Sequence, residues 1–146
     1  MATSKYHQGI FTPKNPNKVQ GNPTPTWRSS WELRIMTFLD SHPNVIGWAS
    51  EAIRIPYRNP LTGKQSMYVP DFLIVYLDKK GQQRTELVEV KPHKETFMEA
   101  AKSRRDKAAV MLNMAKWTAA MAWANKHGVT FRVINEDSIF QNKGKR

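Results

Sequence analysis

The sequence predicts an α/β fold built on a mixed β-sheet with helices packed against it. The chain has 146 residues, about one domain, and its hydrophobic fraction of 40% is enough for a packed core. The predicted elements follow the order helix, three strands, helix, strand. The central strands are almost continuously apolar, as expected when both faces of a sheet are covered.

The first helix is predicted over residues 30–41. Ser29 suits the N-cap position, and the apolar residues Leu33, Met36 and Leu39 recur with helical spacing. A Ser-His-Pro-Asn sequence follows and ends the helix.

The middle of the chain is predicted to be β-structure. Residues 45–57 are expected to be extended, and the Asn-Pro-Leu-Thr-Gly sequence at 59–63 has turn chemistry. Residues 72–77 and 87–90 are apolar and rich in β-branched side chains. They flank Asp-Lys-Lys-Gly-Gln at 78–82, which indicates a β-hairpin.

The last third of the chain is predicted to be a helix followed by a strand. Residues 94–127 are rich in Ala, Met, Lys and Glu and contain no Pro or Gly. They form either one helix or two helices with a break near residues 103–105. Gly128 is suited to end the helix, and residues 129–134 form the last strand.

The chain is strongly basic, with 23 Lys and Arg against 12 Asp and Glu, a net charge of +11 and a pI near 10.1. This imbalance predicts a polyanionic partner, nucleic acid before an anionic membrane. Residues 1–28 hold four basic and no acidic residues with several prolines, so we expect an extended arm that wraps the body or follows a phosphate backbone. Residues 141–146 form a basic tail. The predicted DNA contacts are Lys14, Lys18, Arg28, His93, Lys94, Lys102, Arg104 and Arg105.

Several classes of protein are excluded by composition. The chain has no cysteine, which excludes disulfide scaffolds, thiolate zinc sites and cysteine nucleophiles, and fits a reducing compartment. No apolar run approaches the roughly 18 residues of a membrane span. The N-terminus lacks the apolar region of a signal peptide, so we expect neither secretion nor a membrane partner.

Three charged residues lie where the predicted hairpin strands begin and end. Asp71 begins the first strand, and Glu89 and Lys91 share one face near the end of the second. If the turn centres near Lys80, paired positions sum to about 160, so Asp71 lies opposite Glu89. Two carboxylates this close require a cation, and Mg²⁺ prefers such oxygen ligands. Lys91 is then placed to orient a water molecule or to stabilise charge on a phosphate.

The residues alone leave alternatives open. One alternative is that Asp71, Glu89 and Lys91 form an ordinary solvated ion-pair cluster with no catalytic role. Glu89 argues against this, because it interrupts an apolar strand where a charge is seldom placed without a partner. Glu32 has two interpretations of equal weight. It completes a Ser29-x-x-Glu32 capping box, or it points across to the sheet as a third metal ligand.

The motif resembles that of a known superfamily. Pro70-Asp71, followed eighteen positions later by Glu89-Val90-Lys91, is similar to the signature of the PD-(D/E)xK nucleases. Further segments resemble the head-completion nucleases of tailed phages, which are in turn similar to the endonuclease subunits of some cut-and-paste transposons. These segments are residues 11–16, 28–33, 46–51 and 69–72.

The resemblance implies a restriction-endonuclease-like core over residues 29–140, between the arm and the tail. It implies a metal-dependent endodeoxyribonuclease that hydrolyses phosphodiester bonds in phage head completion or DNA packaging. The implied cofactor is Mg²⁺, which Mn²⁺ can replace, and the implied partners are DNA and phage head or portal proteins. The implied location is the host cytoplasm during assembly, with the virion as a second location. The implied catalytic set is Glu32, Asp71, Glu89 and Lys91, with the three carboxylates as metal ligands.

Two other functions remain as alternatives. One is a non-catalytic DNA-binding head-completion protein, and the other is a branch-resolving or recombination nuclease. The oligomeric state is open, although a dimer would let one compact site per chain cut both strands. Glu51 is a further candidate that either supports the site or faces water.

Overall fold

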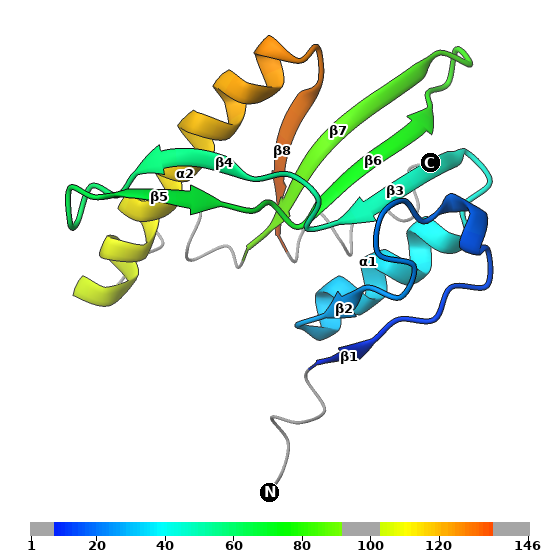
Figure 1. Cartoon of the computed structure of the whole chain (residues 1–146), viewed down its shortest axis with the longest axis horizontal. Coiled ribbons are helices and arrows are strands. Elements are labelled where there is room, and N and C mark those ends of the chain that lie inside the picture. The colour runs from blue at the N-terminus through cyan, green and yellow to red at the C-terminus, as the bar shows by residue number, and fades with distance from the viewer. Residues whose placement is uncertain (1–7, 92–102, 136–146) are drawn as a thin grey trace, which may run out of the picture.

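The computed structural model describes residues 8–91 and 103–135 (Figure 1). The elements in chain order are β1 (Gly9–Ile10), η2 (Pro16–Lys18), β2 (Thr26–Trp27), α1 (Ser30–Ser41), β3 (Val45–Ser50), β4 (Ile55–Arg58), β5 (Gln65–Tyr68), β6 (Phe72–Leu77), β7 (Gln83–Val90), α2 (Arg104–Lys126) and β8 (Thr130–Ile134).

A four-stranded mixed sheet forms the centre of the molecule, in the order β3-β6-β7-β8. The β3–β6 and β6–β7 pairs are antiparallel, and the β7–β8 pair is parallel. Because α2 connects β7 to β8, it supplies the crossover that a parallel pair requires. The predicted α/β class with a mixed sheet is therefore confirmed.

The two helices cover different faces of this sheet. Buried Met36 and Leu39 of α1 pack with Phe72 and Val88 in one cluster. On the other face, Ala120 of α2 belongs to a second cluster with buried side chains of β4, β5 and β7. This explains why β6 and β7 carry apolar residues toward both sides, as the sequence predicted.

The predicted α1 is confirmed, and its N-terminus is capped as expected. The N–H group of Glu32 donates to Ser29 Oγ, and Ile35 lies with Met36 and Leu39 on the buried stripe. The predicted end at Ser41 also holds. Within the described residues, neither helix is long and apolar enough to cross a lipid bilayer.

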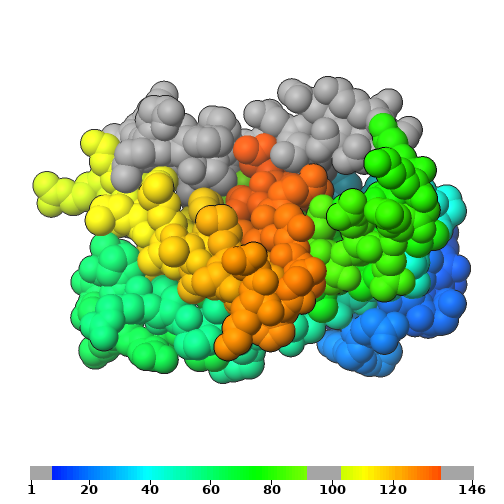
Figure 2. Space-filling model, turned by 90° about the horizontal axis from the view of Figure 1, so that it is seen from above, coloured from blue at the N-terminus to red at the C-terminus, as the bar shows by residue number. Residues whose placement is uncertain are grey.

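The predicted extended segment 45–57 is interrupted in the structure. It divides into β3 and β4, and Glu51 adopts a φ of 53° between them. The turn at 59–63 is confirmed, but the structure adds the strand β5, which the sequence analysis did not predict. Together β4 and β5 form a separate two-stranded hairpin beside α2, at one end of the molecule (Figure 2).

The register predicted for the β6–β7 hairpin is confirmed. Phe72 pairs with Val88 and Leu77 with Gln83, so paired residue numbers sum to 160. The second strand is longer than predicted, because it begins at Gln83 immediately after the turn. The left-handed Gly128 ends α2, as expected. Of the residues predicted to be helical, 94–102 lie outside the described residues. The described helix α2 begins at Arg104.

The described part of the arm packs onto the body. Phe11 is buried and meets the Trp48 ring edge-on at 5.8 Å. Buried Asp40 of α1 accepts hydrogen bonds from the backbone N–H groups of Lys14 and Asn15 at 2.9 and 3.0 Å. These contacts hold residues 11–15 against the body, and the arrangement of the arm as a whole stays a prediction.

We expect Asp40→Ala to lower the free energy of unfolding by about 2 kcal/mol, because two partly buried N–H groups of the arm lose a charged acceptor. Urea denaturation measures this change. Thr37→Ala, on the exposed side of the same helix, is the control and should change stability by less than about 1 kcal/mol. Equal stability of wild type and Asp40→Ala would show that the arm does not depend on this contact.

Candidate active site

The structure brings Asp71, Glu89 and Lys91 together at one end of the sheet. Asp71 directly precedes β6. Glu89 is the second-last residue of β7, and Lys91 follows that strand. The backbone N–H of Val90 donates to Asp71 Oδ2 at 2.8 Å. The β6–β7 register, continued by one residue beyond the Phe72–Val88 pair, places Asp71 opposite Glu89, as predicted.

Burial raises the pKa of both carboxyl groups, because loss of solvent disfavours their charged forms. Glu89 is buried, with 5% of its surface exposed. Loss of solvent and, second, the neighbouring Glu89 raise the pKa of Asp71 to about 8. Loss of solvent also raises the pKa of Glu89. The pair therefore holds less than two negative charges near neutral pH unless a cation joins it.

Two lysines partly compensate these charges. Lys91 Nζ lies 3.8 Å from Glu89 Oε2 and lowers the pKa of Glu89 against the effect of burial. Lys116 of α2 acts in the same direction, and its Nζ lies 5.7 Å from the centre of the Tyr68 ring. The site thus combines two acids and two amines from β7, α2 and the β6 start.

Three buried polar atoms around Tyr68 make no hydrogen bond of good geometry among the described residues. They are Glu89 Oε1, the Tyr68 hydroxyl and Trp117 Nε1. Tyr68 adjoins both Glu89 and Trp117, and loss of solvent with the charge of Glu89 raises its pKa. An unpaired buried carboxylate oxygen is costly. An oxygen-seeking cation with its water molecules would satisfy it, so the donor set fits Mg²⁺.

The sequence analysis missed Tyr68 and Lys116. Tyr68 comes from β5, a strand that was not predicted, and Lys116 is one of many lysines in a long helix. Trp117 packs against the cluster of buried side chains that contains Tyr68 and Ala120. The position of Tyr68 three residues before Asp71 was the one available signal.

Glu32 caps the start of α1, but its side chain bonds the residue before the N-cap Ser29 and not Ser29 itself, as the predicted capping box would require. Its Oε1 accepts from the Arg28 backbone N–H at 2.9 Å, while its own N–H donates to Ser29 Oγ. Burial raises the pKa of Glu32, and its charge helps to raise the pKa of Asp71. Even so, the described residues contain no group of three His, Cys, Asp or Glu arranged to hold one metal ion. Its role as third ligand stays a prediction.

Glu51 supports the backbone of the site. Its N–H donates to the Asp71 carbonyl oxygen at 2.9 Å. Its carboxylate accepts from Arg28 Nε at 2.8 Å and from the second guanidinium nitrogen at 3.1 Å. These bonds, with the left-handed φ of 53°, end β3 beside Asp71. Glu51 thus contacts the Asp71 backbone while it remains exposed to solvent, and its role in the site stays a prediction.

The predicted DNA contacts fall into three groups. Lys14, Arg104 and Arg105 are exposed. Lys18 Nζ donates to the carbonyl oxygen of His42 at 2.7 Å, and the Arg28 guanidinium pairs with Glu51. Three residues lie outside the described residues: His93, Lys94 and Lys102.

A cavity of about 500 Å³ lies elsewhere, between α1 and the sheet. It is lined by Phe38, Tyr76 and Ile134, among others, and none of the four predicted catalytic residues lines it. The candidate site at the end of the sheet is therefore separate from this cavity.

Comparison with known proteins assigns the family. A family model described as "TnsA-like endonuclease N terminal" matches residues 42–136. The chain belongs to this family. It is also 36% identical over 144 residues to the head completion nuclease of Enterobacteria phage T4, with 91% of this chain and 93% of that protein covered. Asp71, Glu89 and Lys91 lie within the part matched to the TnsA-like family, whereas Glu32 precedes it.

The raised pKa of Asp71 predicts how the stability of the metal-free protein depends on pH. The folded state binds this proton more tightly than the unfolded state, where the pKa is near 3.8. The stabilisation is complete below the unfolded pKa and is lost as pH rises through about 8. Asp71→Asn removes this titration. We expect the free energy of unfolding of wild type relative to Asp71→Asn to fall by at least about 1 kcal/mol between about pH 5 and pH 8.5.

Urea denaturation in the presence of a chelator measures this difference at both pH values. Asp78→Asn, a carboxylate at the opposite end of β6, is the control. A parallel pH dependence of wild type and Asp71→Asn would contradict the raised pKa.

Proposed function

We propose that this chain is a Mg²⁺-dependent DNA endonuclease that hydrolyses phosphodiester bonds during phage head completion. The observation that carries the proposal is the Asp71–Glu89 pair, held opposed across two strands with raised pKa values and an unpaired carboxylate oxygen. The TnsA-like family and the name of the T4 relative support nuclease activity and a role in head completion.

Asp71 and Glu89 would hold the metal ion, with Glu32 as a further ligand. Both carboxylates of the pair come from backbone positions fixed by the sheet, so their separation is set before any ion binds. When bound, Mg²⁺ would supply positive charge to the phosphate and to the leaving oxygen. Mn²⁺ prefers similar oxygen ligands and would replace it.

Lys91 would act directly on the reacting groups. Its ammonium carries three N–H donors and lies at the sheet end beside Glu89. From there it would orient a water molecule for in-line attack on the phosphorus, or stabilise the negative charge that develops on the phosphate oxygens. Glu89 keeps the ammonium near the site.

DNA is the expected substrate because the chain carries a net charge of +11. Arg104 and Arg105 present exposed guanidinium groups at the start of α2. Contacts of this kind reach the phosphate backbone, and affinity for DNA should therefore fall steeply with salt. Phage head or portal proteins are the further partners that a role in head completion requires.

We expect purified protein to nick or cut plasmid DNA in Mg²⁺, and a chelator to abolish the activity. Asp71→Asn, Glu89→Gln and Lys91→Ala should each lower the cleavage rate by about 100-fold or more, because each removes a ligand or a charge from the reacting phosphate. Agarose gel electrophoresis of supercoiled plasmid measures the rate. Lys80→Ala, at the far turn of the β6–β7 hairpin, is the control.

Two results would redirect the proposal. Intact plasmid in both Mg²⁺ and Mn²⁺, with DNA binding retained, would support the non-catalytic head-completion protein. Cleavage of branched junctions in strong preference to linear duplex would support the branch-resolving nuclease.

Glu32→Gln separates the two roles of Glu32. Glutamine keeps a side-chain oxygen that can accept from the Arg28 backbone N–H, but it removes the negative charge that a metal ligand supplies. If Glu32 is a ligand, we expect at least a tenfold loss of cleavage with a free energy of unfolding within about 0.5 kcal/mol of wild type. If Glu32→Gln cleaves DNA as fast as wild type and Glu32→Ala is less stable than wild type, Glu32 caps the helix and is not a metal ligand.

A further inference from the structure

The β4–β5 hairpin leaves the central sheet beside the candidate site. It is inserted between β3, which ends next to Glu51, and β6, which begins after Asp71 (Figure 1). One face of the hairpin packs on α2 through the buried side chains of Ile55, Tyr57 and Tyr68. Its other face and its tip are exposed among the described residues.

The exposed face carries side chains suited to a polyanion. Residues 52–70 contain three cations, Arg54, Arg58 and Lys64, and no acidic residue. All three cations are exposed. Leu61 at the tip is 51% exposed and lies between Pro60 and Thr62 in the turn.

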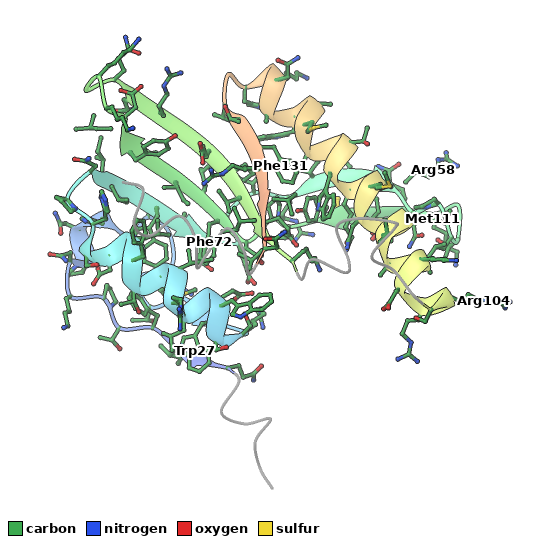
Figure 3. The ribbon with its side chains drawn as sticks, turned by 180° about the vertical axis from the view of Figure 1, so that it is seen from behind. Trp27, Arg58, Phe72, Arg104, Met111 and Phe131 are labelled. Carbon is green, nitrogen blue, oxygen red and sulfur yellow. The ribbon has the colours of Figure 1, made fainter. Side chains whose placement is uncertain are left out.

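The start of α2 extends this basic surface. Figure 2 shows the hairpin and the first turns of α2 at the same end of the molecule, and Figure 3 labels Arg58 and Arg104 at that end. Arg104 and Arg105 occupy a helix N-terminus, where positive charge opposes the helix dipole. The helix dipole therefore does not favour these arginines, which are exposed and available to an anionic partner.

The base of the hairpin is joined to the catalytic carboxylates. Tyr68, the last residue of β5, adjoins Glu89, and three residues later the chain reaches Asp71. A partner that lies along the hairpin would therefore pass beside the paired carboxylates. The fold thus places a basic projection and a candidate hydrolytic site next to each other.

We propose that the β4–β5 hairpin is a DNA-binding arm that holds duplex DNA against the site. Arg54, Arg58 and Lys64 contact phosphates, and the tip with Leu61 enters a groove. The major groove, about 12 Å wide, accepts a two-stranded β-ribbon. The proposal rests on the proposed function, because it assigns the surface that positions the substrate of that nuclease.

The test compares two double variants with the same loss of charge. Arg54→Ser with Lys64→Ser removes two cations from the hairpin. Lys79→Ser with Lys80→Ser removes two exposed cations from the β6–β7 turn, at the other end of the sheet. Arg58 is retained, because its guanidinium donates to the Gly63 carbonyl oxygen at 3.2 Å and supports the turn. Thermal unfolding verifies that both variants fold.

Binding to a fluorescent DNA duplex of about three helical turns is measured by anisotropy in a chelator, over a range of salt concentrations. For the hairpin variant we expect about tenfold weaker binding and a salt slope smaller by about 1.8, from two lost phosphate contacts. The control should change the slope by less than half of that amount. In Mg²⁺, KM for duplex cleavage should rise with the loss of affinity in the hairpin variant alone.

The outcomes separate the two proposals. If wild type does not cleave DNA but the hairpin variant loses affinity, the arm stands and the nuclease proposal fails. If wild type cleaves and both variants bind alike, the DNA-binding arm is overturned. Equal losses in both variants would overturn it too, since they indicate a response to net charge alone.

Discussion

The candidate site depends on two carboxylates that the β6–β7 register forces to face each other. The ladder that ends at the Phe72–Val88 pair, together with the Val90 N–H bond to the Asp71 carboxylate, holds Asp71 close to Glu89. Placing like charges this close in a region of low solvent access opposes folding. Two effects reduce this repulsion. The raised pKa values lower the negative charge of the pair, and the ammonium groups of Lys91 and Lys116 lie near it. A site that is destabilised in this way is prepared to bind a cation, since the cation relieves the repulsion.

Neighbouring elements hold this arrangement in place. Glu51 binds the Asp71 backbone and the Arg28 side chain, so it connects the end of β3 and the arm to the site. Glu32 accepts from the Arg28 backbone one helical turn away. The α1 N-terminus, the β3 end and the β6 start thus meet at one point. This explains how a helix-borne glutamate comes within electrostatic range of Asp71.

The same sheet end also directs the β4–β5 hairpin outward. The chain leaves β3 through the left-handed Glu51 and returns at Tyr68, beside Glu89. The insertion therefore costs the central sheet no hydrogen bonds and adds an exposed basic face next to the paired acids. A buried acidic centre surrounded by exposed cations is the charge distribution that a phosphodiester backbone and a divalent metal require together.

Local sequence determined α1, the β6–β7 hairpin and the opposition of Asp71 and Glu89. The reason is that helical spacing, turn chemistry and the period of two in a strand are short-range rules, and a hairpin register follows from its turn. Tertiary structure alone decided what surrounds the pair. Tyr68 of β5 and Lys116 of α2 both act on Glu89, and Trp117 of α2 adjoins Tyr68. These elements are distant in sequence and meet there only because both pack on the same sheet face. Tertiary structure also assigned Lys18 to helix carbonyl groups and Arg28 to Glu51, because a cation's partner depends on which acceptors folding brings near it.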